Sequence, residues 1–205
     1  MKRYYQDDFV TIYHGDCREV TAWLEADVLV TDPPYGVSFR PGWDNKFQGV
    51  TINNDSSTEA RDDVLEKWAT RPALVFGSWK APKPASTRAV LIWDKGTVGM
   101  GALDVPWFPC TEEIYVIGHG WVGSRSSAVM RHVIRNDNHP TEKPVDLLRD
   151  LIGKCPPGVI ADPFMGSGST LRAAKDLGRK AIGVELEERY CEVAAKRMAQ
   201  EVLAL

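Results

Sequence analysis

The sequence predicts an α/β fold: a mostly parallel sheet of about seven strands with helices on both faces. Short apolar runs bounded by turn residues alternate with amphipathic helical patterns along the chain. One apolar run, residues 28–31, ends on an acid and two prolines, and another leads into a glycine-rich turn followed by a helix. All three features are typical of a sheet whose strands are joined by helices.

The elements follow in order. Strands are predicted at residues 10–13, 28–31, 73–76, 89–93, 113–117, 159–161 and 180–185. Helical patterns lie around residues 20–24, from 58 to 68, from 147 to 152, up to residue 177, and through 190–198. Because the chain contains no repeat or linker that would separate a second unit, residues 1–205 are expected to form a single domain.

Composition excludes several classes of protein. Of the 205 residues, 43% are hydrophobic and 26% are charged, which is ordinary for a globular protein. There is no apolar run near 18 residues and no signal-peptide pattern, so we expect a cytoplasmic protein without a membrane span. The isolated cysteines indicate reduced thiols and no metal site: Cys17, Cys110, Cys155 and Cys191. The net charge of −3 neither indicates nor excludes a nucleic-acid partner.

The segment Asp32-Pro33-Pro34-Tyr35 directly follows a predicted strand. Proline donates no backbone N–H and has a fixed φ, so the strand cannot continue through the two prolines. Asp32 and Tyr35 are therefore expected at the carboxyl end of a strand, on a stiff turn. Ligands of open α/β sheets bind at this edge. The alternative is a plain turn after a buried strand.

A second turn joins a strand to a helix and contains Phe164, Gly166 and Gly168. It lacks the third glycine of the dinucleotide fingerprint, where Leu171 stands, and it lacks the ending of a phosphate-binding Walker loop. Glu185 closes the next strand, where an acid can accept hydrogen bonds from two ribose hydroxyls. The turn and the acid together predict a nucleoside site without a pyrophosphate, which suits S-adenosylmethionine. The alternative is an ordinary tight turn.

With these motifs the chain resembles the DNA N6-adenine/N4-cytosine methyltransferases in their β-class order, in which Asp-Pro-Pro-Tyr precedes Phe-x-Gly-x-Gly. The resemblance implies a Rossmann-like, S-adenosylmethionine-dependent methyltransferase fold. It also rests on an early Gly-Asp segment at residues 14–17 and on His-Pro-Thr-Glu-Lys-Pro at residues 139–144, which would lie beside the cofactor's methionine end. The cofactor-binding residues it implies are Asp16, Cys17, Thr141, Lys143, Asp162, Phe164, Gly166, Gly168, Thr170 and Glu185.

The same resemblance assigns catalysis to Asp32, Pro33, Pro34 and Tyr35. The Asp32 carboxylate and the Pro33 carbonyl would accept the N–H bonds of an exocyclic amine and stabilise the charge that develops as the methyl group arrives. Tyr35 would stack on a target base flipped out of the duplex. Aspartate at the first position is commoner in the adenine enzymes, so N6-adenine is the expected target. N4-cytosine methylation and a non-catalytic nucleic-acid-binding subunit are the alternatives.

The expected partner is DNA, contacted by loops at about residues 37–57, 96–110 and 119–138. No large separate target-recognition region is present in this sequence. The sequence does not give the recognition sequence in DNA. It also does not decide whether the chain forms a homodimer or works with a partner endonuclease as a restriction–modification pair.

Overall fold

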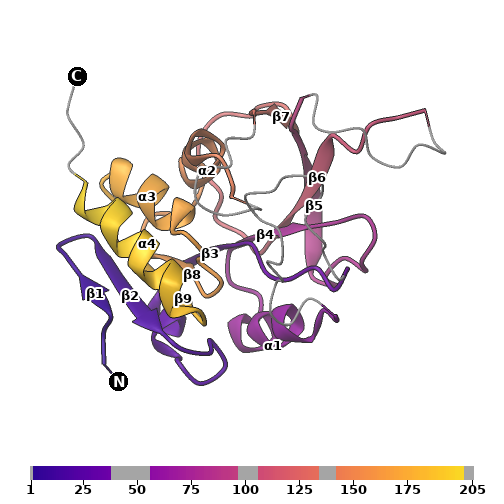
Figure 1. The fold of residues 1–205 in the computed structure, drawn as a ribbon. Helices are drawn as coiled ribbons and strands as arrows, with labels where there is room; N and C mark the ends of the chain where they lie inside the picture. The colour runs from indigo at the N-terminus through magenta and orange to yellow at the C-terminus, as the bar shows by residue number, and fades with distance from the viewer. Residues whose placement is uncertain (1, 38–55, 97–105, 134–141, 201–205) are drawn as a thin grey trace.

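Nine strands form one sheet in the computed structural model, which describes residues 2–37, 56–96, 106–133 and 142–200 (Figure 1). The strands are β1 (Tyr5–Gln6), β2 (Val10–His14), β3 (Val28–Thr31), β4 (Ala73–Gly77), β5 (Thr87–Asp94), β6 (Thr111–Ile117), β7 (Val129–Arg131), β8 (Ile160–Asp162) and β9 (Ala181–Glu185). Their order across the sheet is β1-β2-β9-β8-β3-β4-β6-β5-β7.

The pairing confirms the predicted α/β fold with a mostly parallel sheet. Strands β2, β9, β8, β3 and β4 pair in parallel, as do β5 and β7, whereas β1–β2, β4–β6 and β5–β6 are antiparallel. The predicted number of about seven strands is too low. The two additional strands, β1 and β7, have two and three residues, too few for an apolar pattern, and each forms by pairing with a longer neighbour.

The helices are α1 (Glu59–Trp68), α2 (Val145–Ile152), α3 (Ser169–Asp176) and α4 (Glu188–Ala199). The helix predicted around residues 20–24 is only a four-residue 3-10 helix, η1 (Ala22–Glu25). It is short because Ala26 is already extended and leads into β3 at Val28.

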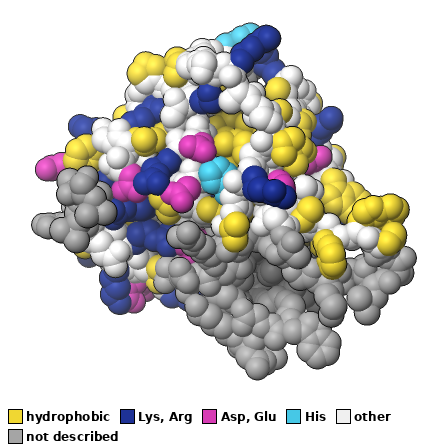
Figure 2. All heavy atoms as spheres, turned by 90° about the horizontal axis from the view of Figure 1, so that it is seen from above, with side chains coloured by type: hydrophobic (Ala, Val, Ile, Leu, Met, Phe, Trp, Pro, Cys, Tyr) yellow, Lys and Arg dark blue, Asp and Glu magenta, His cyan; other side chains and the backbone are white. Residues whose placement is uncertain are grey.

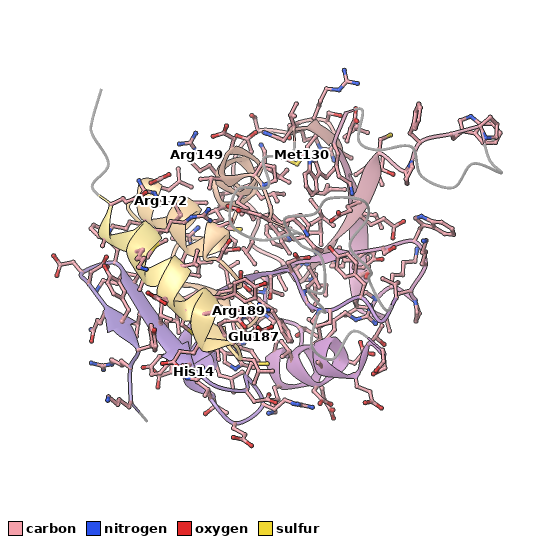
Figure 3. The ribbon with its side chains drawn as sticks, in the orientation of Figure 1. His14, Met130, Arg149, Arg172, Glu187 and Arg189 are labelled. Carbon is pink, nitrogen blue, oxygen red and sulfur yellow. The ribbon has the colours of Figure 1, made fainter. Side chains whose placement is uncertain are left out.

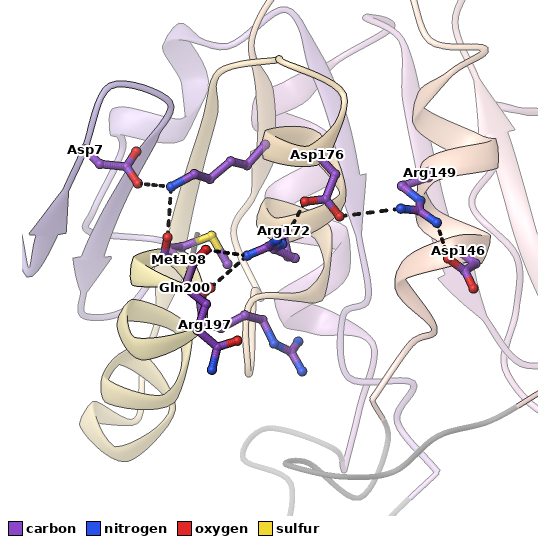
Figure 4. Close-up of polar contacts among 9 residues, drawn as sticks. Asp7, Asp146, Arg149, Arg172, Asp176, Arg197, Met198 and Gln200 are labelled. Carbon is purple, nitrogen blue, oxygen red and sulfur yellow. Dashed lines mark hydrogen bonds and ion pairs between the residues drawn. The ribbon is translucent and has the colours of Figure 1, made fainter. Parts of the chain in front are cut away.

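Two apolar cores cover the two faces of the sheet. On one face α2, α3 and α4 bury Leu147, Leu171 and Met198, and on the other η1 and α1 bury the stacked rings of Trp23 and Trp68. Figure 1 shows α2 and α3 at the top of the view and α1 at the bottom. Polar contacts also join the helices of the first face (Figure 4): the Arg172 guanidinium on α3 donates to carbonyls at the end of α4.

None of the helices within the described residues has both the length and the apolar character that crossing a membrane requires.

Strands β3 and β8 lie at the topological switch point of the sheet. These strands are neighbours, but the chain leaves β3 through α1 on one face and leaves β8 through α3 on the other face. The connections after the two strands therefore lead to opposite faces of the sheet, and open α/β sheets have their ligand-binding crevice at such a switch point. Asp32 follows β3 and Phe164 follows β8, so both predicted motifs lie at this crevice.

Candidate active site

Asp32 is held from both sides at the end of β3. Its Oδ1 accepts a hydrogen bond from the Tyr35 hydroxyl at 2.6 Å, and its Oδ2 lies 2.6 Å from Nζ of Lys143. The Tyr35 hydroxyl also lies 3.0 Å from Oε2 of Glu112, so its single proton is shared between two carboxylates. The Asp32 side chain is still 23% exposed.

Glu112, at the start of β6, is the second carboxylate of the site. Its Oε2 lies 3.3 Å from the Lys143 ammonium, and its Oε1 accepts a hydrogen bond from Lys95 at 2.8 Å. The Lys143 side chain is only 6% exposed, so its charge depends on these two acids. We refer to Asp32, Tyr35, Lys95, Glu112 and Lys143 as the acid–lysine cluster.

The charges in the cluster follow from burial and mutual contacts. Burial raises the pKa of Asp32, and Glu112 raises it further, while Lys143 opposes both effects. At Glu112 burial would also raise the pKa, but Lys143 and Lys95 outweigh it and lower the pKa. The pKa of Lys143 is raised, because its two carboxylates outweigh burial. Burial and the two acids raise the pKa of Tyr35 well above 10, so its hydroxyl stays protonated.

Glu185 and the glycine turn form one unit on the other side of the crevice. Gly166 has a φ of +51°, which favours glycine, and its N–H donates to Oε2 of Glu185 at 2.9 Å. The N–H of Glu187 donates to Oε1 at 2.8 Å. Glu185 forms no salt bridge within the described residues, and each carboxylate oxygen keeps further acceptor capacity. A half-buried carboxylate of this kind fits a pair of ribose hydroxyls.

Four predicted cofactor residues build the turn itself: Asp162, Phe164, Gly168 and Thr170. Asp162 is buried and accepts hydrogen bonds from the Thr31 hydroxyl at 2.7 Å, from the N–H of Phe164 at 3.1 Å and from Thr170. Burial raises the pKa of Asp162 to about 7. A Cβ on Gly168 would lie 2.9 Å from that of Ala194, so packing against α4 requires glycine there. Their contact with the cofactor stays a prediction.

The early Gly-Asp segment lies beside Glu185. The N–H of Gly15 donates to the Glu185 carbonyl at 2.9 Å, and Asp16 follows with its carboxylate paired to Arg18. Figure 3 shows His14 next to Glu187, at the start of α4. Cys17 is buried in the core with Trp23, and burial raises the pKa of its thiol to about 12. Thr141 lies outside the described residues.

Sequence reasoning did not single out Lys95 or Glu112. One signal was present, since two adjacent acids, Glu112 and Glu113, precede the apolar residues of a predicted strand. An acid at a strand end is a candidate when other motifs lie at the same edge of the sheet. The Lys143 ammonium, assigned to the cofactor by the resemblance, contacts Asp32 and Glu112 in the structure.

The predicted DNA-contacting loops are described in part. Of the loop at 37–57, residues 38–55 lie outside the described residues, as do 97–105 and 134–138 of the other two. On the described part of the face in Figure 2, basic and acidic side chains are interspersed. Three exposed aromatic side chains follow β4 or precede β6 in the chain: Trp79, Trp107 and Phe108.

Comparison with known proteins identifies the family. The model of the N6/N4 methyltransferase family, which is described as DNA methylase, matches residues 92–196, half of the chain. This chain belongs to that family.

Two relatives of this methylase match over nearly its whole length. YubD of Escherichia coli (strain K12), provisionally described as a methylase, is 29% identical over 220 residues, covering 90% of this chain and 88% of YubD. The Type II methyltransferase M.ScaI of Streptomyces caespitosus is 23% identical over 281 residues, covering 100% of this chain and 86% of M.ScaI.

Solved structures share the fold of this methylase. The M1.HpyAVI–SAM complex has a TM-score of 0.66 at 21% identity and covers 93% of this chain and 100% of its own. The cytosine-N4-specific PvuII DNA methyltransferase has a TM-score of 0.70 at 15% identity, and the match covers 99% of this chain and 91% of the PvuII enzyme. These likenesses confirm the predicted Rossmann-like methyltransferase fold.

Proposed function

We propose that this methylase transfers a methyl group from S-adenosylmethionine to the exocyclic N6 amine of adenine in DNA. The methyl donor is S-adenosylmethionine, in keeping with the family and with the M1.HpyAVI–SAM complex, which has the same fold. Glu185 and the turn around Gly166 would hold the nucleoside part of the cofactor. When bound, the cofactor supplies an activated methyl group on a sulfonium.

The observation that carries the proposal is the Asp32 carboxylate at the crevice, beside the glycine turn. An exocyclic amine is a weak nucleophile because its lone pair is delocalised into the ring. Acceptors aimed at its N–H bonds favour the pyramidal nitrogen and stabilise its developing positive charge. Asp32 and the Pro33 carbonyl supply two such acceptors. The proton that the amine loses passes to Asp32 or to water.

Asp32 favours adenine over cytosine on the basis of the resemblance, because aspartate at this motif position is commoner in N6-adenine enzymes. The competing target is the N4 amine of cytosine, since the PvuII enzyme, with a similar fold, is cytosine-N4-specific. A non-catalytic subunit is the third reading, and the intact Asp32 and Glu185 weigh against it.

Further parts of the proposal concern how DNA is engaged. The target base leaves the duplex to reach Asp32, because an amine inside the stack is inaccessible. Tyr35 would stack on that base while its hydroxyl stays on Asp32 and Glu112. All 205 residues act as one domain in the cytoplasm. A homodimer of two such chains is compatible with the proposal.

Product analysis tests the target. The full chain is incubated with methyl-deuterated S-adenosylmethionine and mixed-sequence DNA, and the digested nucleosides are analysed by mass spectrometry. Deuterated N6-methyladenine is expected, and Asp32→Ala should abolish it. Deuterated N4-methylcytosine would instead support the cytosine reading. Cofactor binding by calorimetry without either product would support the non-catalytic one.

A further inference from the structure

The acid–lysine cluster places two carboxylates on one ammonium. Nζ of Lys143 lies 2.6 Å from Asp32 and 3.3 Å from Glu112, and Glu112 carries Lys95 on its other oxygen. Two acids and two lysines make the cluster neutral as a whole. Since Lys143 is nearly inaccessible, removing any one of these charges leaves another uncompensated in a poorly solvated place.

Aromatic rings also hold the Lys143 ammonium. It lies 5.6 Å from the ring centroid of Tyr35, 5.2 Å from that of Phe76 and 5.9 Å from that of Trp93. Ring faces attract cations, most strongly away from water. The rings and the two acids therefore keep the lysine protonated and in one place.

Each element packed around Asp32 brings one group to it. Lys143 comes from the segment before α2, Glu112 from β6, and Tyr35 from the same turn. Asp162 at the end of β8 is a further acid near enough to interact electrostatically. Among these groups Lys143 is the cation in direct contact, while Glu112 competes with Asp32 for it.

We propose that Lys143 and Glu112 are positioning residues for the methyl transfer, setting the charge and orientation of the Asp32 carboxylate that accepts the amine's N–H bonds. The inference rests on the proposed function. Lys143 donates to Oδ2 of Asp32 and holds it in place, and its positive charge favours the ionised carboxylate. Glu112 contacts the Lys143 ammonium and the Tyr35 hydroxyl. Because the positive charge of Lys143 is shared between Glu112 and Asp32, Glu112 weakens the attraction between Lys143 and Asp32.

The two residues therefore have opposite effects on the pH dependence of the rate. Without Lys143, Asp32 loses the cation on its Oδ2 and still faces the nearby Glu112 carboxylate, so the pKa of Asp32 rises and the acid limb of the pH–rate profile moves to higher pH. Without the Glu112 charge, Lys143 serves Asp32 alone, so the pKa of Asp32 falls and the limb moves to lower pH. A limb that moves by one pH unit changes the rate measured at a fixed pH on that limb about tenfold.

The experiment compares Lys143→Met, Lys143→Arg and Glu112→Gln with a control, Lys175→Met. Lys175, in the last turn of α3, forms a lysine–aspartate pair with Asp7 at the same 2.6 Å distance, at the opposite end of α3 from the glycine turn; Asp7 is labelled in Figure 4. Single-turnover methylation is measured against pH. The ionisation of Asp32 is followed by carboxyl-carbon NMR in cofactor-free protein, its signal assigned with Asp32→Asn.

The acid limbs of Lys143→Met and Glu112→Gln are expected to move in opposite directions by about one pH unit or more, with Lys143→Arg close to wild type and Lys175→Met unchanged. Unmoved limbs and an unmoved Asp32 signal, with rates merely reduced, would overturn the inference. If Lys143→Met does not fold, Glu112→Gln and Lys143→Arg still decide it. A wild-type protein that methylates no DNA contradicts the proposed function instead, and the NMR titration still tests the cluster.

Discussion

Glu142 and Lys143 are neighbours in the chain, but their side chains contact opposite sides of the crevice. Glu142 is paired with Arg197 of α4 and lies 3.4 Å from the Ser169 hydroxyl at the start of α3. Lys143 reaches Asp32 after β3. The pair therefore joins the helices of the glycine-turn half to the carboxylate of the other half.

Breaking the junction should destabilise the fold. Arg197→Met removes the guanidinium that pairs with the Glu142 carboxylate, which is 6% exposed, and losing one partner of a buried pair costs about 3–5 kcal/mol. Urea denaturation measures the free energy of unfolding. Lys196→Met removes the neighbouring cation from an exposed pair with Glu192 and should leave stability nearly unchanged. Equal, small losses in both variants would mean that the junction contributes little.

Asp162 should make stability fall as the pH rises from about 4 to about 7. Its pKa is about 7 in the folded protein against an ordinary 3.8, so in this window the folded state holds a proton that the unfolded state has lost. Asp162→Asn mimics the neutral carboxyl and should be more stable than wild type at pH 7.5 by up to about 4 kcal/mol, but not at pH 4. A wild-type-minus-variant difference that is the same at both pH values contradicts this.

Glu185→Ala should weaken cofactor binding. Hydrogen bonds from ribose hydroxyls to a carboxylate are worth roughly 1.5–3 kcal/mol, so calorimetry should show the dissociation constant rising about 10- to 150-fold. Glu187→Gln is the control, because it removes a nearby charge but keeps the backbone N–H that donates to Glu185. Melting temperatures confirm that both variants are folded. Unchanged affinity in Glu185→Ala would place the ribose elsewhere.

Asp32→Ala should abolish methyl transfer while cofactor affinity stays. Loss of a transition-state acceptor costs about 2.7–4 kcal/mol, so the single-turnover rate should fall by at least about two to three orders of magnitude. Asp32→Asn should be milder, because its amide oxygen still accepts a hydrogen bond but carries no charge. If Asp32 only stabilises the turn, the alanine variant would instead melt lower and bind cofactor poorly. A folded, cofactor-binding Asp32→Ala with near wild-type turnover contradicts the mechanism.

Local signals made half of the site predictable from the sequence. Two prolines stop β3 at Asp32, and parallel strands bring Glu185 and the glycine turn to the same edge. The acid–lysine cluster was not predictable in this way. Tyr35 and Glu112 are 77 positions apart and Asp32 and Lys143 are 111 apart. Glu112 reaches Tyr35 because β6 pairs antiparallel to β4, and Lys143 reaches Asp32 from the segment before α2; no local pattern specifies either contact.

The exposed aromatic side chains near the catalytic edge should contact DNA. Trp79 follows the carboxyl end of β4 and is 74% exposed. Trp107 is 77% exposed and precedes β6. Because β6 runs antiparallel to β4, β6 begins where β4 ends, so both tryptophans lie close in the chain to that end of the strands. Stacking of a base on an aromatic ring is worth roughly 1–3 kcal/mol, so Trp79→Ala and Trp107→Ala should each raise the dissociation constant for DNA about 5- to 150-fold.

Phe9→Ala is the matched control for these tryptophans. Phe9 is a 39% exposed aromatic residue just before β2, at the opposite edge of the sheet, and its removal should leave DNA affinity unchanged. Fluorescence anisotropy with labelled duplex, at two salt concentrations, measures all three variants. Because stacking is not a charge contact, the salt dependence of binding should stay at its wild-type slope in the tryptophan variants. Single exposed apolar residues are common on protein surfaces, and if Trp79 and Trp107 are of that ordinary kind, their variants will bind DNA as Phe9→Ala does.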